Sequence, residues 1–212
     1  MKAALFDMDG TLIDIFNLWR GLLECYLAPF GASLTESQFF QAMKLPYDKL
    51  AVYLQETCAL PKTHQEIMDE IDELSIKEYA NRATLKEGVD VCIRSLHEQG
   101  LRLFVVTTNL GVIAQKVLKR FSLDSYFSGV YGIHELRYKK ALPACFLDIA
   151  ERIGAEPNEC VVFEDSPKAA RSAKDAGMYV VGVIGEQLED EIKELTAVAD
   201  RLVFNNYGRM EL

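Results

Sequence analysis

Short runs of apolar residues recur along the chain and are separated by longer amphipathic stretches. A short unbroken apolar run is typical of a parallel strand that is covered on both faces, because neither side of such a strand meets water. Strands that alternate with helix-length segments predict a doubly wound α/β fold with a mainly parallel sheet and right-handed crossovers. The runs that we interpret as strands are residues 3–6, 101–106, 160–163, 179–183 and 201–204.

The stretches between these runs have the spacing of amphipathic helices. In residues 146–153 the apolar positions recur every three or four residues, and Gly154 follows as a helix stop. Residues 113–121 carry a similar apolar stripe. Ser166 and Pro167 come directly after a predicted strand, where a serine cap and a first-turn proline favour the start of a helix.

Residues 15–84 break this alternation. Several stretches in this region have helical character, and none has a convincing strand pattern. The simplest interpretation is a helical block inserted after the first strand. We therefore predict a core domain of residues 1–14 and 85–212, and a helical domain of residues 15–84. The helical stretches are residues 16–26, 36–43, 47–56 and 64–80.

The composition narrows the class of protein. Half of the residues are hydrophobic and 26% are charged, which is typical of a globular protein. The 32 acidic residues outnumber the 23 basic residues, and the net charge of −9 disfavours nucleic acid or an anionic membrane surface as a partner. We interpret the acidic run at residues 186–194 as the solvated face of a helix.

The N-terminus and the cysteines favour a cytoplasmic location. Asp7 ends the first apolar stretch too early for a signal peptide, and no apolar run is long enough for a membrane span. The five cysteines are odd in number and widely spread, without a CxxC pair, which disfavours a disulfide framework or a zinc site. We predict buried thiols in a reducing compartment.

Acidic side chains follow two of the predicted strands. Asp7 and Asp9 come directly after the first strand, with Gly10 allowing a sharp turn, and Glu164 and Asp165 follow residues 160–163. Ligands of an open parallel sheet bind beyond the carboxyl ends of its strands, where these acids would emerge. Four converging carboxylates would repel one another without a cation. Hard oxygen ligands without histidine or cysteine predict Mg²⁺ rather than zinc.

Hydroxyl, amide and cationic groups are predicted at the same edge. Thr107, Thr108 and Asn109 end another strand and supply hydroxyl and amide groups, and Lys140 precedes the helix that starts near Pro143. Taken singly, each feature also fits a structural role: a threonine cap, a solvated lysine or an acidic helix start. Their order along the chain and their placement at strand ends favour a shared site.

These motifs together resemble the haloacid dehalogenase superfamily of phosphohydrolases over essentially the whole chain. The matching positions are the DxDGT stretch at residues 7–11, Thr107, Lys140, and Glu164 with Asp165 in the stretch FEDSP. The resemblance implies a Rossmann-like core in which residues 15–84 form an inserted helical cap.

The resemblance also implies roles for individual residues. Asp7 would be the nucleophile that forms an aspartyl-phosphate, and Asp9 would be the general acid and then the general base. Mg²⁺ would be held by the Asp7 carboxylate, the backbone carbonyl of Asp9 and Asp165, with Glu164 close by. The phosphoryl oxygens would be bound by Thr107 and Lys140, with Thr108, Asn109 and Gly10 as further candidates.

The substrate expected is a small-molecule phosphate ester, for a monomer or a homodimer. Asp9 favours phosphate esters, because dehalogenases of the superfamily lack an acid at this position. A sugar-phosphate mutase remains an alternative, although Arg20 and Lys44 are the only early cap cations. A phosphoacceptor signalling module is a remote second alternative, and the sequence does not specify which ester is bound.

Overall fold

A computed structural model describes residues 1–212 apart from 44, 46, 186, 205–206, 209 and 211–212. The chain divides into two compact units. Residues 1–15 and 83–212 form a unit built on a β-sheet, called the sheet unit below, and residues 16–82 form the helical unit.

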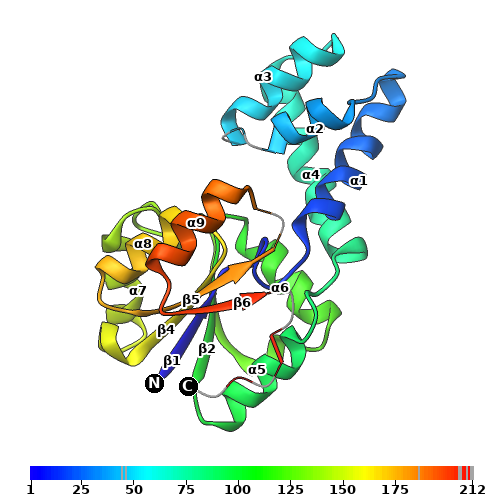
Figure 1. The fold of residues 1–212 in the computed structure, drawn as a ribbon. Coiled ribbons are helices and arrows are strands. Elements are labelled where there is room, and N and C mark those ends of the chain that lie inside the picture. The colour runs from blue at the N-terminus through cyan, green and yellow to red at the C-terminus, as the bar shows by residue number, and fades with distance from the viewer. Residues whose placement is uncertain (44, 46, 186, 205–206, 209, 211–212) are drawn as a thin grey trace. The chain divides into compact units, whose positions relative to one another are not determined.

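The described residues of the sheet unit form one parallel sheet with the strand order β3-β2-β1-β4-β5-β6 (Figure 1). From β1 the chain builds outwards to β3, and it then returns to the middle and builds the other half from β4. The predicted doubly wound α/β fold is therefore confirmed. The strands are β1 (Ala3–Phe6), β2 (Arg102–Val106), β3 (Phe127–Tyr131), β4 (Cys160–Glu164), β5 (Tyr179–Ile184) and β6 (Arg201–Phe204).

Helices cover both faces of this sheet (Figure 1). On one face, Phe146, Ala170 and Leu195 of three helices join Leu5 and Phe104 of two strands in a buried cluster. Burial on both faces is the physical reason for the unbroken apolar runs in the sequence. The helices are α5 (Val89–Glu98), α6 (Gly111–Arg120), α7 (Pro143–Arg152), α8 (Pro167–Asp175) and α9 (Glu189–Val198), with short 3₁₀ turns at Asp124–Tyr126 and Pro157–Glu159.

The edge strand β3 has no counterpart in the sequence prediction. Its residues Phe127–Tyr131 include Ser128 and Gly129, and the strand is only partly buried. Within the described sheet β3 pairs with β2 alone, so part of it faces water. A rule that looks for continuous apolar runs cannot find such a strand.

Two local predictions were wrong. Cys25 is exposed and Cys58 is half-buried, whereas buried thiols were expected; Cys92, Cys145 and Cys160 are buried. Ser166 does occupy the N-cap position of α8, but its hydroxyl makes no capping hydrogen bond.

The acidic run at residues 186–194 was predicted to be the solvated face of a helix. Its acids in α9 are exposed, as predicted, and Glu186 lies outside the described residues.

In the helical unit the four predicted helices are confirmed. They pack around an apolar cluster that includes Leu22, Phe39, Leu54 and Ile71. Among the described residues, no helix combines the length and the apolarity that crossing a membrane requires. The helices are α1 (Ile15–Leu27), α2 (Glu36–Met43), α3 (Tyr47–Cys58) and α4 (His64–Arg82), with a 3₁₀ turn at Ala28–Phe30.

Candidate active site

The acidic loops leave the sheet at the point where its winding reverses. Strands β1 and β4 are neighbours, with Phe6 paired to Phe163, and Asp7 and Glu164 come next on each strand. The backbone N–H of Asp7 donates to the Phe163 carbonyl at 3.0 Å, which ties the first acidic position to β4. Such a switch point is where ligands of doubly wound sheets bind.

The loop after β1 is folded tightly on itself. The Met8 carbonyl accepts N–H donors from Thr11 at 3.3 Å and Ile13 at 3.1 Å. Gly10 has a φ of +83°, and a Cβ added there would lie 2.2 Å from Oδ2 of Asp165. Glycine is therefore needed both for the backbone conformation and for the close approach of the second acidic loop.

Lys140 is buried between two carboxylates. Its Nζ lies 2.5 Å from Oδ1 of Asp7 and 2.7 Å from Oε2 of Glu164, and the lysine is only 5% exposed. Burial disfavours the ammonium ion, but the two carboxylates outweigh this and raise the pKa of Lys140 above its usual value. The lysine therefore supplies a permanent positive charge.

The acidic cluster contains more negative charge than Lys140 balances. Carboxylate oxygens of Asp7, Glu164 and Asp165 lie within 4.8 Å of one another. Burial raises the pKa of Glu164 to about 7 despite the opposing effect of Lys140. Burial and the charges of Asp7 and Glu164 raise the pKa of Asp165 well above its usual value. An oxygen-only donor set with excess negative charge, in which Asp7 and Glu164 are buried and Asp165 is half-buried, fits Mg²⁺.

Asp9 faces the loop that follows β2. Its Oδ2 accepts a hydrogen bond from Nδ2 of Asn109 at 3.0 Å, and Oδ1 of Asn109 accepts the N–H of Leu110 at 2.8 Å. Thr107 is buried, and its Oγ1 accepts the N–H of Asn109 at 3.1 Å. Among the described residues, the carboxylates that could hold a metal ion together are those of Asp7, Glu164 and Asp165.

Three further residues named from the sequence are Thr108, Arg20 and Lys44. Thr108 is exposed, and no hydrogen bond among the described residues ties its side chain to the cluster. Arg20 belongs to the helical unit, where it pairs with Glu36 at 2.8 and 3.0 Å and covers the Phe39 ring at 4.4 Å. Lys44 lies outside the described residues.

Two supporting residues were missed by sequence reasoning. The Thr11 hydroxyl lies 3.4 Å from Oδ1 of Asp165 and links the two acidic loops; its position in the DxDGT stretch was the available signal. Gln187 donates to the carbonyls of Asp165 at 3.3 Å and Val183 at 2.8 Å. Gln187 belongs to no local motif, and only the shared sheet edge could have indicated it.

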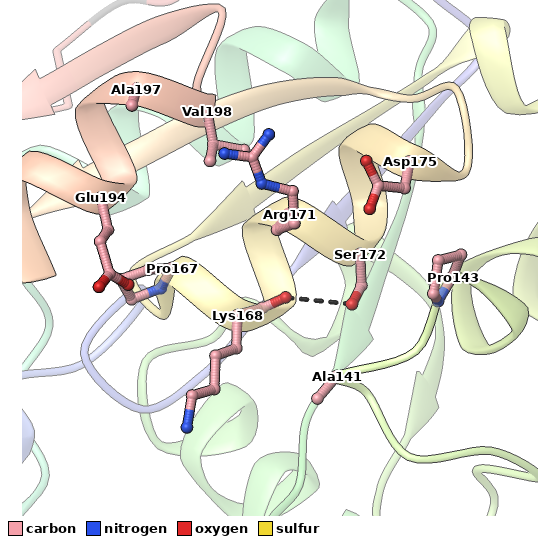
Figure 2. Close-up of a pocket in the computed structure, with 10 residues that line it drawn as sticks. All are labelled: Ala141, Pro143, Pro167, Lys168, Arg171, Ser172, Asp175, Glu194, Ala197 and Val198. Atoms are coloured by element: carbon pink, nitrogen blue, oxygen red, sulfur yellow. Dashed lines mark hydrogen bonds between the residues drawn. The ribbon is translucent and has the colours of Figure 1, made fainter.

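A separate pocket of about 480 Å³ lies among α7, α8 and α9 (Figure 2). Figure 2 shows the side chains of Lys168, Arg171 and Glu194 at this pocket, and a hydrogen bond from the Ser172 hydroxyl to the Lys168 carbonyl at 3.0 Å. Among the described lining residues, none is a predicted site residue, although Ala141 follows Lys140 in the chain. The pocket therefore does not contain the acidic cluster.

The chain is similar in sequence to known proteins. Residues 4–183 match the family model described as haloacid dehalogenase-like hydrolase. A Drosophila melanogaster protein named as a probable pseudouridine-5'-phosphatase is 31% identical over 193 residues, covering 88% of this chain and 83% of that protein. The phosphorylated carbohydrates phosphatase of Thermotoga maritima is 26% identical over 207 residues, covering 96% and 94% of the two chains.

A solved structure gives the same likeness in three dimensions. It is that of a Thermotoga maritima protein provisionally described as a beta-phosphoglucomutase. The TM-score is 0.80 at 27% identity, and the match covers 97% of this chain and 95% of that one.

Proposed function

The chain belongs to the haloacid dehalogenase-like hydrolase family, and on this premise we propose that it hydrolyses small-molecule phosphate monoesters with Mg²⁺, through a phosphorylated Asp7. One observation carries the proposal: buried Lys140 bridges Asp7 and Glu164 at 2.5 and 2.7 Å, beside the carboxylate of Asp165. This arrangement supports the proposal of a nucleophile, a fixed cation and a metal-ligand set at one edge of the sheet. The curated relatives are named as phosphatases.

In the first half-reaction, we propose that an Oδ atom of Asp7 attacks the phosphorus atom. The new bond joins the carboxylate oxygen to phosphorus, while the bond from phosphorus to the ester oxygen breaks. Asp9 donates its proton to that departing oxygen, so that the product leaves as a neutral alcohol. The hydrogen bond from Asn109 to Oδ2 holds the Asp9 carboxyl group in place for this transfer.

In the second half-reaction, water attacks the phosphorylated Asp7 at phosphorus. Asp9, now ionised, takes the proton of the water, and the bond between phosphorus and the Asp7 oxygen breaks. Inorganic phosphate leaves, and Asp7 returns as a carboxylate. Lys140 remains charged throughout and offsets the negative charge of the phosphoryl oxygens.

The residues present fit the expected cation. Asp7, Glu164 and Asp165, together with the Asp9 carbonyl, would hold Mg²⁺, as the oxygen-only donor set favours. When bound, Mg²⁺ neutralises negative charge on the phosphoryl group. Thr107 accepts a hydrogen bond from the Asn109 N–H, which leaves its hydroxyl proton available for a phosphoryl oxygen. Gly10, Thr108 and Asn109 are proposed to line the same phosphate site.

We further propose that the helical unit is a cap that selects the organic part of the substrate. The resemblance implies this role for residues 15–84, and the curated relatives carry names that refer to phosphorylated pseudouridine and carbohydrates. A sugar- or polyol-bearing phosphate monoester is therefore the proposed substrate class.

A phosphate-release assay tests the proposed function. The full chain is incubated with Mg²⁺ and a panel of sugar, polyol and nucleoside monophosphates, in parallel with samples containing EDTA. We expect steady phosphate release from at least one ester, loss of release with EDTA, and no release by Asp7→Asn. Absence of turnover across the panel, or equal turnover by Asp7→Asn, would contradict the proposal.

The same assay separates hydrolysis from the alternative of a sugar-phosphate mutase, which the likeness to the Thermotoga maritima structure keeps open. A mutase would require catalytic amounts of a sugar bisphosphate and would isomerise a monophosphate with little net phosphate release. A hydrolase releases phosphate without that requirement.

A further inference from the structure

Tyr207, near the C-terminus, lies against the catalytic loop. Its side chain is buried, and its hydroxyl donates to the backbone carbonyl of Thr11 at 2.5 Å. Its own N–H donates to the Glu87 carbonyl at 3.0 Å. Burial raises the pKa of Tyr207 well above its usual value, so the hydroxyl keeps its proton and remains a donor.

The carbonyl that Tyr207 holds belongs to the residue that joins the two acidic loops. Thr11 is fully buried, its N–H donates to the Met8 carbonyl at 3.3 Å, and its hydroxyl lies 3.4 Å from Asp165. Thr11 also follows Gly10, where a Cβ would strike Asp165. A shift of the Thr11 backbone would therefore move the contact between the acidic loops.

The ring of Tyr207 also supports the ends of both acidic strands. It stacks on Phe163, with 6.2 Å between ring centroids and 28° between planes, and Phe163 stacks on Phe6 at 4.3 Å. Phe6 immediately precedes Asp7, and Phe163 immediately precedes Glu164. Two of the three stacked rings thus come directly before the two acidic positions in the chain, and Tyr207 lies at one end of this stack.

A second anchor holds the C-terminal segment to the sheet unit. The Met210 carbonyl accepts hydrogen bonds from the Ser95 hydroxyl at 3.3 Å and from Nε2 of Gln99 at 2.7 Å. Ser95 and Gln99 lie on and just after α5, away from the acidic loops in the chain. The segment therefore has one anchor at the catalytic loop and another at α5.

We propose that Tyr207 is a positioning residue that holds the Asp7–Thr11 loop against Asp165 and so fixes the metal-ligand set. The inference goes beyond the motif residues and rests on the proposed function for its catalytic consequence. Its structural consequence, restraint of the loop, does not depend on that function. Loss of the hydroxyl leaves a buried carbonyl without its donor, which loosens the loop while the ring stack remains.

The test compares Tyr207→Phe with two matched controls. Ser95→Ala removes a hydrogen bond from the other anchor of the same segment, and Tyr26→Phe removes a hydroxyl that donates to Glu70 at 3.1 Å in the helical unit. With p-nitrophenyl phosphate, we expect Tyr207→Phe to lower kcat about tenfold with KM changed less than about twofold. We expect both controls to keep the wild-type kcat.

Two measurements test the inference without depending on catalytic turnover. Amide hydrogen exchange in the peptide that covers residues 8–13 should quicken in Tyr207→Phe and not in the controls, because the loop has lost its restraint. Calorimetric titration with Mg²⁺ should show weaker binding in the same variant. Circular dichroism at the assay temperature verifies that each variant is folded.

Unchanged exchange and unchanged Mg²⁺ binding in Tyr207→Phe would overturn the inference, whatever the activity. Equal losses in Tyr207→Phe and Ser95→Ala would also overturn it, because they would indicate a general effect of the C-terminal segment. If the wild-type chain releases no phosphate but exchange and Mg²⁺ binding change as expected, the proposed function fails and the positioning role stands.

Discussion

Among the described residues, both units have ion pairs at the surface, such as Lys2–Glu159 of the sheet unit, but the sheet unit also has pairs whose partners are both buried. In the sheet unit, Asp7, Lys140 and Glu164 are buried and paired with one another. In the helical unit, the described ion pairs each keep at least one partner in contact with solvent, and the interior is an apolar cluster. Those pairs are Arg20–Glu36, Lys62–Glu70 and Arg82–Glu78.

This contrast distinguishes charged side chains that serve a chemical use, which are buried, from charged side chains that serve solubility, which are exposed. A buried charge is expensive unless it is paired and hydrogen-bonded, and replacing a whole buried ion pair by well-packed apolar residues often costs nothing in stability. The three buried charged groups of Asp7, Lys140 and Glu164 at one edge of the sheet therefore indicate a chemical use. In the helical unit the buried acid Glu78 pairs with the more exposed Arg82, and the interior cluster is apolar, so this cost is smaller there.

The largest difference between the units is expected from removing one acid in each. Asp7→Asn removes the proposed nucleophile, so phosphate release should fall by roughly a thousandfold or more. Glu78→Gln in the helical unit changes a buried acid that pairs with Arg82 at 3.1 Å, and release should stay within about twofold of wild type. Comparable losses in the two variants, measured at saturating ester, would remove the functional distinction between the units.

The next largest difference between the units is expected from replacing one paired lysine in each. Lys140→Met leaves Asp7 and Glu164 buried without a counter-ion, which should cost about 3–5 kcal/mol and lower the Tm of the metal-free protein by roughly 10 °C. Lys62→Met breaks a 2.5 Å pair with partly exposed Glu70, and its Tm should change by no more than about 2 °C. Thermal melts with EDTA measure both. Similar shifts would show that burial of the Lys140 pairs has no special energetic weight.

Replacing one glycine of positive φ in each unit by alanine gives the next comparison. Gly10→Ala combines a φ of +83° with a Cβ 2.2 Å from Asp165, so it should cost about 2–3 kcal/mol and reduce phosphate release strongly. Gly31→Ala in the helical unit has a φ of +65° but no atom within 4 Å of the new Cβ. It should cost only about 1 kcal/mol and leave turnover unchanged. Denaturant melts and initial rates test both variants; equal effects on turnover would contradict the close approach at Gly10.

The smallest effect is in the pH dependence of stability without metal. Glu164 has a pKa raised to about 7 by burial, so the native state binds a proton that the unfolded chain, with an ordinary pKa of 4.5, does not. This contribution is complete below the unfolded pKa and is lost as the pH rises through the folded one. The Tm with EDTA should therefore fall by a few degrees between pH of about 5 and about 8.

Two controls accompany this melt. Glu164→Gln should reduce the decline, because its side chain does not titrate while Asp165, whose pKa is also raised, still does. Saturating Mg²⁺ should raise the Tm most at the higher pH. Glu70 in the helical unit should contribute a pH dependence of the opposite sign, because its hydrogen bond with Lys62 lowers its pKa. Its contribution to stability is present above the pKa of the unfolded chain and is lost as the pH falls. A metal-free Tm that rises with pH in wild type but not in Glu164→Gln would contradict the charge excess.

Much of the fold could be read from the apolar pattern. Strands β1, β4 and β5 are buried on both faces and appear as continuous runs in the sequence, and the helices of residues 16–82 follow their 3.6-residue spacing. Strand β3 could not be read in this way, because an edge strand that contains Ser128 and Gly129 is only partly buried. The pattern reports burial, and it loses an element where burial is incomplete.

The residues of the candidate site also differ in whether the sequence could predict them. Asp7, Asp9, Glu164 and Asp165 carry their signal in short motifs at strand ends, and the structure brings them to one edge. Residues such as Gln187 and Tyr207 reach the site through contacts between segments far apart in the chain. No local spacing encodes such a contact, so only the folded chain reveals it.

Phosphorylation of Asp7 itself tests the proposed chemistry most directly. The wild-type enzyme is mixed with Mg²⁺ and a turned-over phosphate ester, quenched in acid during steady turnover, and digested for peptide mass analysis. We predict a phosphoryl group on Asp7 in the N-terminal peptide and none in Asp7→Asn. Active turnover with that peptide unmodified, or with the phosphoryl group on another residue, would contradict Asp7 as the nucleophile.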